Sequence, residues 1–370
     1  MLMIMGFGAV VTKFCVLCGW GADCWLAEQF QHVEWHGLRF EDTIFPLFLF
    51  LAGVSWPFSF AKQSERGDST RRIVLRCLKR AALLSLFGFL HQGVLGGYFR
   101  VGNVLTRIGL AWMIGALLFM GCRTRTRVAL ALLLPIAHWL LLWFVPAPDA
   151  LTVVPPAKMA DTIMSFGTGP YSIVGNLSGW VDRHVIPGPL SPYTGVADNQ
   201  SALGLIPAVG TALLGMLTGE FVQKTRASMA DYRRIGFMLL SAIGLIGLGL
   251  FIANGFGEMS MPINKKLWDA PFVFVVGGYS VMMFALFHGI VDVLGCRKWA
   301  FFFRVIGMNS ITIYLAQRFI PFRQIAKNLV GDLTKLCPPA VDDFLMSVAY
   351  VAVCWLFLFF LYRKNVFLRV

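Results

Sequence analysis

The stretch TIFPLFLFLAGVSWPFSFA, residues 43–61, indicates what class of protein this is. It contains no charged residue and is close to the length of about 20 residues that a helix needs to cross a bilayer. Comparable runs recur along the chain, in which 57% of the 370 residues are hydrophobic and only 14% are charged. Because a soluble domain carries about 25% charged residues, the sequence predicts an integral membrane protein.

The apolar runs together predict an all-α fold, a polytopic membrane bundle of about ten transmembrane helices. We expect one transmembrane domain over residues 1–370, with the outer loops 20–42 and 147–200 capping its outer mouth. The chain opens on an apolar run without a basic region, so we expect the first span to be entered partway through. The expected spans are 1–19, 43–61, 81–98, 104–122, 128–146, 201–222, 235–254, 271–294, 300–319 and 342–362.

The basic residues predict the orientation of this bundle. The net charge is +13, and most cations fall in alternate connections, at 62–80, 123–127, 224–234 and 297–304, and after the last span at 363–369. By the positive-inside rule these segments are cytoplasmic, which places the C-terminus in the cytoplasm and residues 30–42 on the outer side. Topology beside a lipid bilayer therefore explains the charge, and we expect no nucleic-acid partner.

Neither the cysteines nor any phosphate-binding loop motif indicates a specific activity. Three of the eight cysteines, Cys15, Cys18 and Cys24, cluster near the first expected span. They serve as small packing residues, or Cys18 and Cys24 form a disulfide if their loop is extracytoplasmic. The sequence has no G-x-x-x-x-G-K-[ST] loop, which argues against an ATP-driven pump.

Two histidines, His32 and His36, stand in HVEWH just before the second expected span. On a helix this spacing would place both on one face, as in a zinc site. The segment matches neither H-E-x-x-H nor H-x-x-E-H, so we expect no metal. Two alternatives stay open: an interfacial pair that is hydrogen-bonded beside Trp35, or a catalytic histidine that takes a proton from an amine or hydroxyl.

Asp42 opens the second expected span, and its position allows two roles. An acidic residue in the first turn caps a helix and interacts favourably with the helix dipole. Alternatively, its carboxylate orients His32 or holds a substrate amine. Capping is the ordinary role of such a residue and the sequence favours it.

Several polar residues fall at membrane depth, where an unpaired polar group is costly. Such residues face a cavity or one another, and the simplest role for Asn309 and Ser310 is hydrogen bonding between helices. Arg107 is harder to explain in this way, because an intramembrane cation needs an acidic partner, carbonyl groups or an anionic ligand. The set consists of Arg100, Asn103, Arg107, Asn264, Lys265, Lys266, Asn309, Ser310, Tyr314 and Gln317.

A basic helical stretch, STRRIVLRCLKRAA, lies on the expected cytoplasmic side. Its ordinary role is a topology anchor beside anionic lipid. The alternative is a binding patch for a donor that carries a nucleotide, such as coenzyme A. Its cations are Arg72, Arg76, Lys79 and Arg80.

Five motifs, taken in order, carry a resemblance to a known family. They are HVEWHGLRFEDTIFPLFLFLAGVS, RVGNVLTRIGLAW, GLIPAVGTALLGMLTG, PINKKLWDAPFVFVVGGYS and VIGMNSITIYLAQ. Together they resemble the membrane acetyltransferases related to heparan-α-glucosaminide N-acetyltransferase, in particular their bacterial homologues. The resemblance covers nearly the whole chain, from the first expected span to the ninth.

The resemblance implies a reaction and a compartment. Acetyl-CoA from the cytosol donates its acetyl group to the amino group of a glucosamine-type sugar on the periplasmic side of a bacterial inner membrane. The family's active histidine lies in H-x-x-W-x-G-L, which matches His32, Trp35, Gly37 and Leu38 here. His36 takes the variable position before the glycine, so the resemblance implies His32 as the general base.

The resemblance also implies roles for the other polar residues. Asn264 and Asn309 would donate hydrogen bonds to the oxyanion. Trp35, His36, Asp42, Lys265, Ser310 and Asp198 would line the acceptor pocket, although ADNQSA departs from the family's Asp-Pro-Glu-Gly at Gln200. Arg107 and Arg100 would contact the donor inside the membrane, and the cytoplasmic donor sites would be Arg72, Arg76, Lys79 and Arg80.

Two other classes of protein stay open. A transporter or flippase for an amino sugar or glycolipid would explain the spans and the polar residues, but it requires no histidine at the outer edge and no acetyl-CoA. A purely structural membrane subunit would leave Arg107 unexplained. By analogy with the family, a homodimer is the expected assembly.

Overall fold

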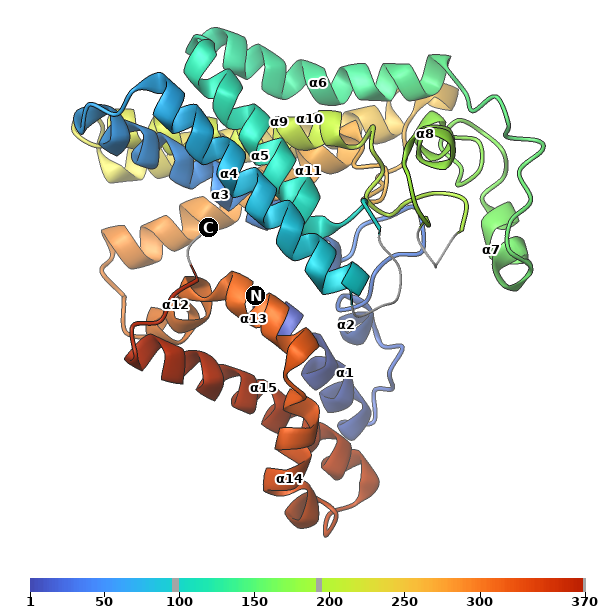
Figure 1. Cartoon of the computed structure of the whole chain (residues 1–370), viewed down its shortest axis with the longest axis vertical. Coiled ribbons are helices and arrows are strands. Elements are labelled where there is room, and N and C mark those ends of the chain that lie inside the picture. The colour runs from blue at the N-terminus through green and yellow to red at the C-terminus, as the bar shows by residue number, and fades with distance from the viewer. Residues whose placement is uncertain (95–99, 191–194, 369–370) are drawn as a thin grey trace. The chain divides into compact units, whose positions relative to one another are not determined.

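The computed structural model describes residues 1–94, 100–190 and 195–368 (Figure 1). Helices and loops make up these residues, and no β-strand occurs among them. The chain forms two compact units and passes between them after Glu34, after Leu38, within helix α3 after Ile44, and after Gly289. The first unit consists of residues 1–34, 39–44 and 290–370, and the second unit of residues 35–38 and 45–289.

Seven helices of the described residues are long and apolar enough to cross a membrane, which confirms the predicted all-α, polytopic fold. Each corresponds to one of the expected spans. They are α3 (Phe40–Glu65), α5 (Val104–Gly121), α6 (Thr124–Phe144), α9 (Leu205–Thr225), α10 (Asp231–Asn254), α11 (Ala270–His288) with its π-helical extension η5 (Gly289–Val293), and α15 (Pro339–Arg363).

The other three expected spans differ from a single long apolar helix. The first is a short π-helix, η1 (Met3–Phe7), followed by α1 (Gly8–Leu17). The third corresponds to α4 (Thr70–Phe89), whose first half carries the basic residues, and to η2 (Leu90–Val94); residues 95–98 lie outside the described ones. The ninth is divided at Asn309 into α12 (Ala300–Met308) and α13 (Ser310–Phe319).

The core of the second unit is built around α9. Helices α5, α6 and α11 contact α9, while α4 lies against α5 and α10 lies against α11. Glycines permit the closest approach, because a Cβ on Gly215 would lie 2.1 Å from the carbonyl oxygen of Phe50 on α3. Small residues at such interfaces let membrane helices pack backbone to backbone. This arrangement makes α9 the most enclosed of the long helices.

The connection between α6 and α9 is folded and belongs to the second unit. It contains η3 (Ala157–Met159), α7 (Ala160–Ser165) and α8 (Leu177–Val185). The guanidinium of Arg183 on α8 donates to the carboxylate of Asp149 at 2.6 and 3.0 Å and to the carbonyl of Val196 at 2.6 Å. A second short helix, η4 (Gly257–Met259), follows α10.

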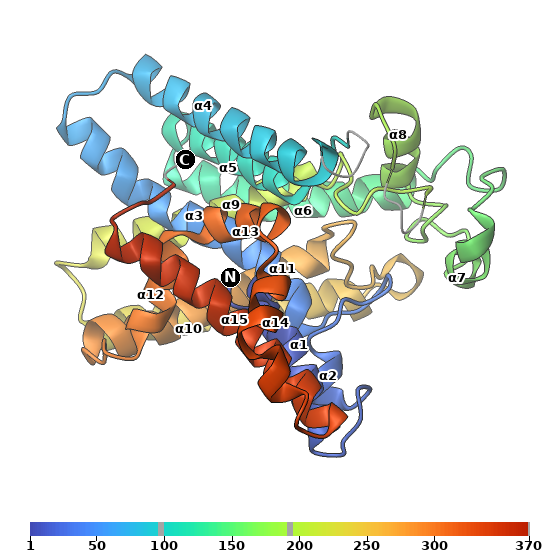
Figure 2. The ribbon, with the colours of Figure 1, turned by 60° about the horizontal axis from the view of Figure 1, so that its bottom comes forward.

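The first unit is organised by α15. Helices α1, α12 and α14 (Phe322–Thr334) contact it, and the short α2 (Trp25–Glu28) lies against α1 (Figure 2). The buried side chains include Met5, Val305, Ile313 and Leu358. Cys18 and Cys24 are free thiols, so the disulfide alternative does not form.

Candidate active site

A histidine–carboxylate pair lies just before and at the start of α3. The Nδ1 of His32 is 2.8 Å from Oδ1 of Asp42. The His32 side chain is 59% exposed, whereas that of Asp42 is only 1% exposed. The imidazole of His32 therefore lies at the surface of the first unit, and the buried carboxylate of Asp42 fixes its orientation.

Asp42 combines the two roles that the sequence left open. It is the third residue of α3, and its Oδ2 accepts a hydrogen bond at 3.2 Å from the backbone N–H of Arg39, just before the helix begins. An acidic side chain at this position that reaches back to the N-cap amide is half of a capping box. One carboxylate oxygen thus caps the helix while the other meets His32.

The pairing assigns different functions to the two nitrogens of His32. A carboxylate accepts a proton, so the neutral imidazole donates its Nδ1–H to Asp42 and carries its lone pair on Nε2. A buried carboxylate on Nδ1 also stabilises the imidazolium that forms when Nε2 takes a proton. This arrangement is suited to general-base chemistry at Nε2.

His36 has different surroundings, although it follows His32 by only four residues. Its ring lies 5.8 Å from that of Phe166, and its Nδ1 is 3.4 Å from Nδ2 of Asn264. Burial lowers the pKa of His36 to about 4, so its ring is neutral at neutral pH.

Residues 32–36 are not helical, so the i,i+4 geometry considered for zinc does not form. Among the described residues, no group of three His, Cys, Asp or Glu side chains suits a metal ion.

The segment around His36 is anchored to the loop before α11. Trp35 is buried, and its Nε1 donates to the carbonyl of Tyr171 at 2.8 Å. The backbone N–H of Gly37, a residue with φ of +116°, donates to the carbonyl of Ile263 at 2.8 Å. The ammonium of Lys266 lies 5.7 Å from the Trp35 ring. Glycine suits this position because its backbone is left-handed.

Asn264 organises that same loop. Its Oδ1 accepts hydrogen bonds from the backbone N–H groups of Lys266 at 2.8 Å and Leu267 at 3.0 Å. Its Nδ2 faces His36, and Lys265 beside it is half-buried. Within the second unit, the structure therefore brings together Trp35, His36 and Asn264 of the residues predicted to form the site.

Asp269, which the sequence reasoning missed, ends this loop. Its Oδ1 caps α11 by accepting from the backbone N–H of Phe272 at 2.7 Å, while its Oδ2 has no partner among the described residues. Complete burial raises the pKa of Asp269 well above its ordinary value, which favours the protonated acid. The signal was an Asp directly before an apolar run, a typical capping position.

Arg100 and Asp198 form a buried bidentate ion pair. The guanidinium donates Nε–H to Oδ2 at 2.8 Å and Nη2–H to Oδ1 at 2.6 Å, and Nη2 also reaches the side-chain oxygen of Gln200 at 3.3 Å. The backbone N–H of Asp198 donates to Asp182. The two residues were predicted to contact the donor and the acceptor separately, but here each neutralises the other.

Arg107 keeps an unused donor in the wall of a cavity. Its Nη2 donates to the carbonyl of Ser201 at 2.8 Å, and its guanidinium carbon lies 5.1 Å from the ring centre of Trp268. Its buried Nη1 has no partner among the described residues. The cavity has a volume of about 160 Å³ and is also lined by Asn103, Thr106, Asp182, Asp198 and Gln200.

Two more groups of this region were missed from the sequence. Asp182 accepts the backbone N–H groups of Asp198 and Ala202, and its burial raises its pKa to about 6. His138 is buried in α6, and neither of its ring nitrogens has a partner among the described residues. His138 stands inside the apolar run PIAHWLLLWF, and a polar residue at such a depth is itself a functional signal.

Asn309 and Ser310 mark the break between α12 and α13 in the first unit. The Nδ2 of Asn309 donates to the carbonyl of Val366 at 3.1 Å, and its Oδ1 accepts from the hydroxyl of Thr312 at 3.1 Å. Asn309 has φ of −125° and ψ of 34°, outside helical geometry, and Ser310 is the first residue of α13. The amide of Asn309 thus ties the helix break to the C-terminal segment.

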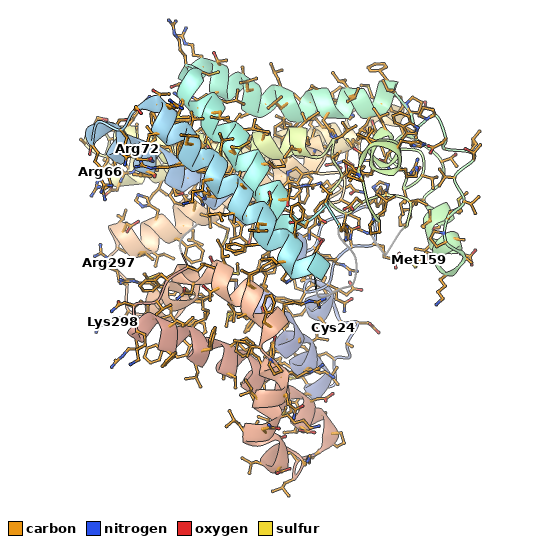
Figure 3. All side chains as sticks on the ribbon, in the orientation of Figure 1. Cys24, Arg66, Arg72, Met159, Arg297 and Lys298 are labelled. Carbon is orange, nitrogen blue, oxygen red and sulfur yellow. The ribbon has the colours of Figure 1, made fainter. Side chains whose placement is uncertain are left out.

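The basic stretch occupies α4 and the turn before it. Arg72 pairs with Asp68 at 3.2 Å, Arg76 contacts the same carboxylate and the side chain of Gln63, and Lys79 is exposed. These pairings lower the pKa of Asp68. Figure 3 shows Arg72 at the N-terminal end of α4. The guanidinium carbon of Arg80 lies 4.2 Å from the ring centre of Trp112.

The fold and these sites define a polytopic helical membrane protein with a histidine–carboxylate pair at the start of one membrane-spanning helix, α3. No family model matches the chain. The chain is similar to human heparan-alpha-glucosaminide N-acetyltransferase, with 26% identity over 385 residues that cover 92% of this chain and 56% of the relative. The mouse enzyme of the same name is 25% identical over 386 residues, with the same coverage.

The similarity extends along nearly the whole chain, which confirms the resemblance that the five motifs predicted. At this level of identity the relationship is one of distant homology. The chain spans about half the length of the curated relatives that it matches.

Proposed function

We propose that this chain is a transmembrane N-acetyltransferase. It transfers the acetyl group of cytosolic acetyl-CoA to the amino group of a glucosamine-type sugar on the periplasmic side of a bacterial inner membrane. The observation that carries the proposal is the His32–Asp42 pair, at 2.8 Å, in one of the five motifs on which the resemblance to the acetyltransferase family rests. The acceptor class follows the name of those relatives, heparan-alpha-glucosaminide N-acetyltransferase.

His32 acts as the general base in this proposal. As the sugar nitrogen bonds to the thioester carbonyl carbon, Nε2 of His32 takes the proton that the amine loses. Asp42 holds the Nδ1–H and stabilises the resulting imidazolium. When the carbon–sulfur bond breaks, the imidazolium returns the proton to the leaving thiolate, so the products are the N-acetyl sugar and the free thiol of CoA. An acetyl-His32 intermediate is the two-step variant of the same assignment.

Asn264 is the better supported of the two amides proposed for the oxyanion. Its Oδ1 is held by two backbone amides, which orients the Nδ2 group, and that group makes only a long contact of 3.4 Å. The Nδ2 of Asn309 instead donates to Val366. A preoriented donor is effective because it needs no reorganisation when charge develops. Trp35, Lys265, Ser310 and the Asp198 region remain proposed acceptor contacts.

Arg107 is the proposed donor contact inside the membrane. An unused N–H in the wall of a cavity of about 160 Å³ suits a neutral carbonyl group on a thin chain, such as an amide of the pantetheine arm. Arg100 would support this wall through Asp198. On the cytoplasmic side, the phosphates would meet Arg72, Arg76, Lys79 and Arg80 and would compete with Asp68 for the first two.

Thiol release tests this proposal. Detergent-purified protein is incubated with acetyl-CoA and glucosamine, and release of free thiol that requires both substrates is the expected result. The variant His32→Ala should abolish release while acetyl-CoA still binds, as measured by a thermal shift. The matched control is His184→Asn, because His184 is an exposed histidine of α8 that meets the carbonyl and the ring of Trp180 and lies outside the proposed site. Near-normal turnover by His32→Ala would remove the assignment.

A carrier of amino sugars or glycolipids is the second candidate, and one observation favours it. The helix divided at Asn309 is of the discontinuous type that forms substrate sites in many transporters. Uptake of glucosamine into proteoliposomes without acetyl-CoA, and without thiol release, would support the carrier. Thiol release without uptake would support the enzyme.

A further inference from the structure

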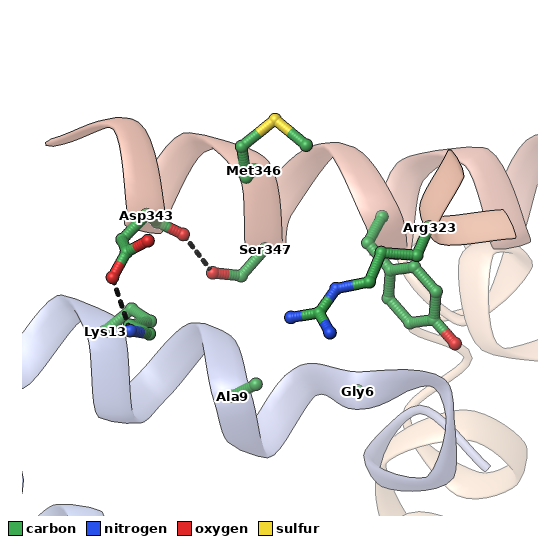
Figure 4. Close-up of a pocket in the computed structure, with 8 residues that line it drawn as sticks. Gly6, Ala9, Lys13, Arg323, Asp343, Met346 and Ser347 are labelled. Atoms are coloured by element: carbon green, nitrogen blue, oxygen red, sulfur yellow. Dashed lines mark hydrogen bonds and ion pairs between the residues drawn. The ribbon is translucent and has the colours of Figure 1, made fainter. Parts of the chain in front are cut away.

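The first unit contains a cavity that the proposed acetyl transfer does not use. Its volume is about 350 Å³, and it lies where η1 and α1 meet α14 and α15 (Figure 4). All of its lining residues belong to the first unit. They are Gly6, Ala9, Lys13, Arg323, Asp343, Met346, Ser347 and Tyr350.

A glycine makes room for this cavity. Gly6 has φ of +96° and interrupts the helical geometry within η1, just before α1. A Cβ on Gly6 would lie 2.9 Å from Cε1 of Tyr350, which is too close for an ordinary contact. Together with the small side chain of Ala9, this bend leaves space between α1 and α15.

The cavity carries an uncompensated positive charge. The ammonium of Lys13 pairs with Oδ2 of Asp343 at 2.5 Å, which neutralises the single carboxylate of the lining. The guanidinium of Arg323 extends into the cavity (Figure 4) and has no hydrogen bond or ion pair within the described parts of the chain. An arginine in this state is suited to bind a phosphate or carboxylate with two parallel N–H bonds.

Hydroxyl groups extend the polar side of the cavity. The hydroxyl of Ser347 donates to the carbonyl of Asp343 at 2.6 Å, so its oxygen keeps only acceptor capacity. The hydroxyl of Tyr350 accepts from Nε2 of Gln317 at 2.7 Å and also meets the thiol of Cys354, so its partners lie within the protein. Arg323 therefore supplies the donors that an anion requires.

The helix that carries Arg323 has the character of an interfacial helix. On α14, Leu329 is 68% exposed and Leu333 is 71% exposed, and with Ile325 they form an apolar stripe at helical spacing. Arg323 and Lys327 are exposed cations of the same helix. A helix with an exposed apolar stripe and basic residues lies in the headgroup region of a bilayer.

We propose that this cavity binds the headgroup of an anionic phospholipid. Arg323 pairs with the phosphate, and the exposed leucines of α14 lie on a different face of the helix. The lipid is favoured over free phosphate because this apolar stripe places α14 in the headgroup region of a bilayer, where phospholipid phosphates lie next to its basic residues. On the expected topology the site faces the outer leaflet.

The test compares two cations of α14. The full chain, purified in detergent, is titrated with short-chain phosphatidylglycerol, and binding is followed by native mass spectrometry. Arg323→Gln should raise the dissociation constant by roughly tenfold, as expected for the loss of one charge-assisted contact. Lys327→Gln is the matched control, because Lys327 is exposed one turn away and does not line the cavity; it should change the constant by less than about twofold.

Two outcomes overturn the proposal. Equal binding of phosphatidylglycerol to the wild type and to Arg323→Gln would remove Arg323 from the site. Binding of inorganic phosphate as tight as that of the lipid would identify a soluble phosphate as the ligand. Neither measurement uses acetyl transfer, so the result stands apart from the proposed enzymatic activity.

Discussion

His32 and His36 are only four positions apart, but their surroundings differ. His32 belongs to the first unit, is largely exposed, and is held by the carboxylate of Asp42. His36 belongs to the second unit, lies against Phe166 and Asn264, and has its pKa lowered to about 4 by burial. One boundary between the two compact units, after Glu34, falls in the three residues between these histidines.

Under the proposed function, this difference suits His32 to chemistry and His36 to packing. A general base needs access to its substrate, a defined tautomer and a pKa near the working pH. The His32 segment meets the first two requirements through exposure and through Asp42. The His36 segment is neutral and enclosed, which suits its contact with the loop before α11.

The largest expected effect is that of His32→Ala. The rate of thiol release should fall by about 10³–10⁴-fold, within the range that general bases contribute. The midpoint of thermal unfolding should change little, because the ring is mostly exposed. A fall in the midpoint of thermal unfolding with retained activity would assign His32 a structural role.

Loss of the buried Arg100–Asp198 ion pair in the second unit should lower stability, whereas loss of His32 should lower activity. Arg100→Ala leaves the carboxylate of Asp198 buried without its partner, which should cost about 3–5 kcal/mol of unfolding free energy. Thermal unfolding in detergent measures the effect. The matched control is Arg72→Ala, which breaks a pair whose arginine is exposed and should cost at most about 1 kcal/mol. Equal losses would show that burial does not distinguish the two pairs.

The variant Asp42→Asn tests whether the carboxylate beside His32 contributes to the reaction or only caps helix α3. The amide still accepts a hydrogen bond from Arg39, so the helix cap is retained, but it no longer carries a charge beside Nδ1. We expect turnover to fall on the order of 10²-fold. An unchanged rate of thiol release would limit Asp42 to helix capping.

Asp182 gives a pH dependence to the stability of the second unit. Burial raises its pKa from 3.8 to about 6, so the folded state holds the proton more tightly than the unfolded state. Its contribution is therefore complete below pH 3.8 and is lost as the pH rises through about 6, by roughly 1 kcal/mol per pH unit. Thermal midpoints between pH 4 and 8 should fall in the wild type and should be flatter in Asp182→Asn.

The smallest expected effect is that of His36→Asn. The side chain is neutral and contacts Asn264 through Nδ1, a contact that an amide can replace. We expect kcat and KM for both substrates to stay within about threefold of the wild type. A loss comparable to that of His32→Ala would show that both segments take part in the chemistry.

The sequence by itself determined the class of the protein and much of its helical framework. Hydropathy is a local property, so runs such as 43–61 identify spans without knowledge of their neighbours. The motif around His32 and the position of Asp42 at a helix start are likewise readable from a few adjacent residues. Local signals also exist for His138 and Asp269, although they were missed.

Only the tertiary structure decided how the polar residues are paired. Arg100 and Asp198 are 98 residues apart, and no local pattern shows that they neutralise each other. The same applies to the burial of His36 against the loop of Asn264, to the helix break at Asn309 and to the cavity beside Arg323. The physical reason is that charge pairing and burial depend on which distant segments fold together, whereas hydropathy and helix capping depend on neighbours in the chain.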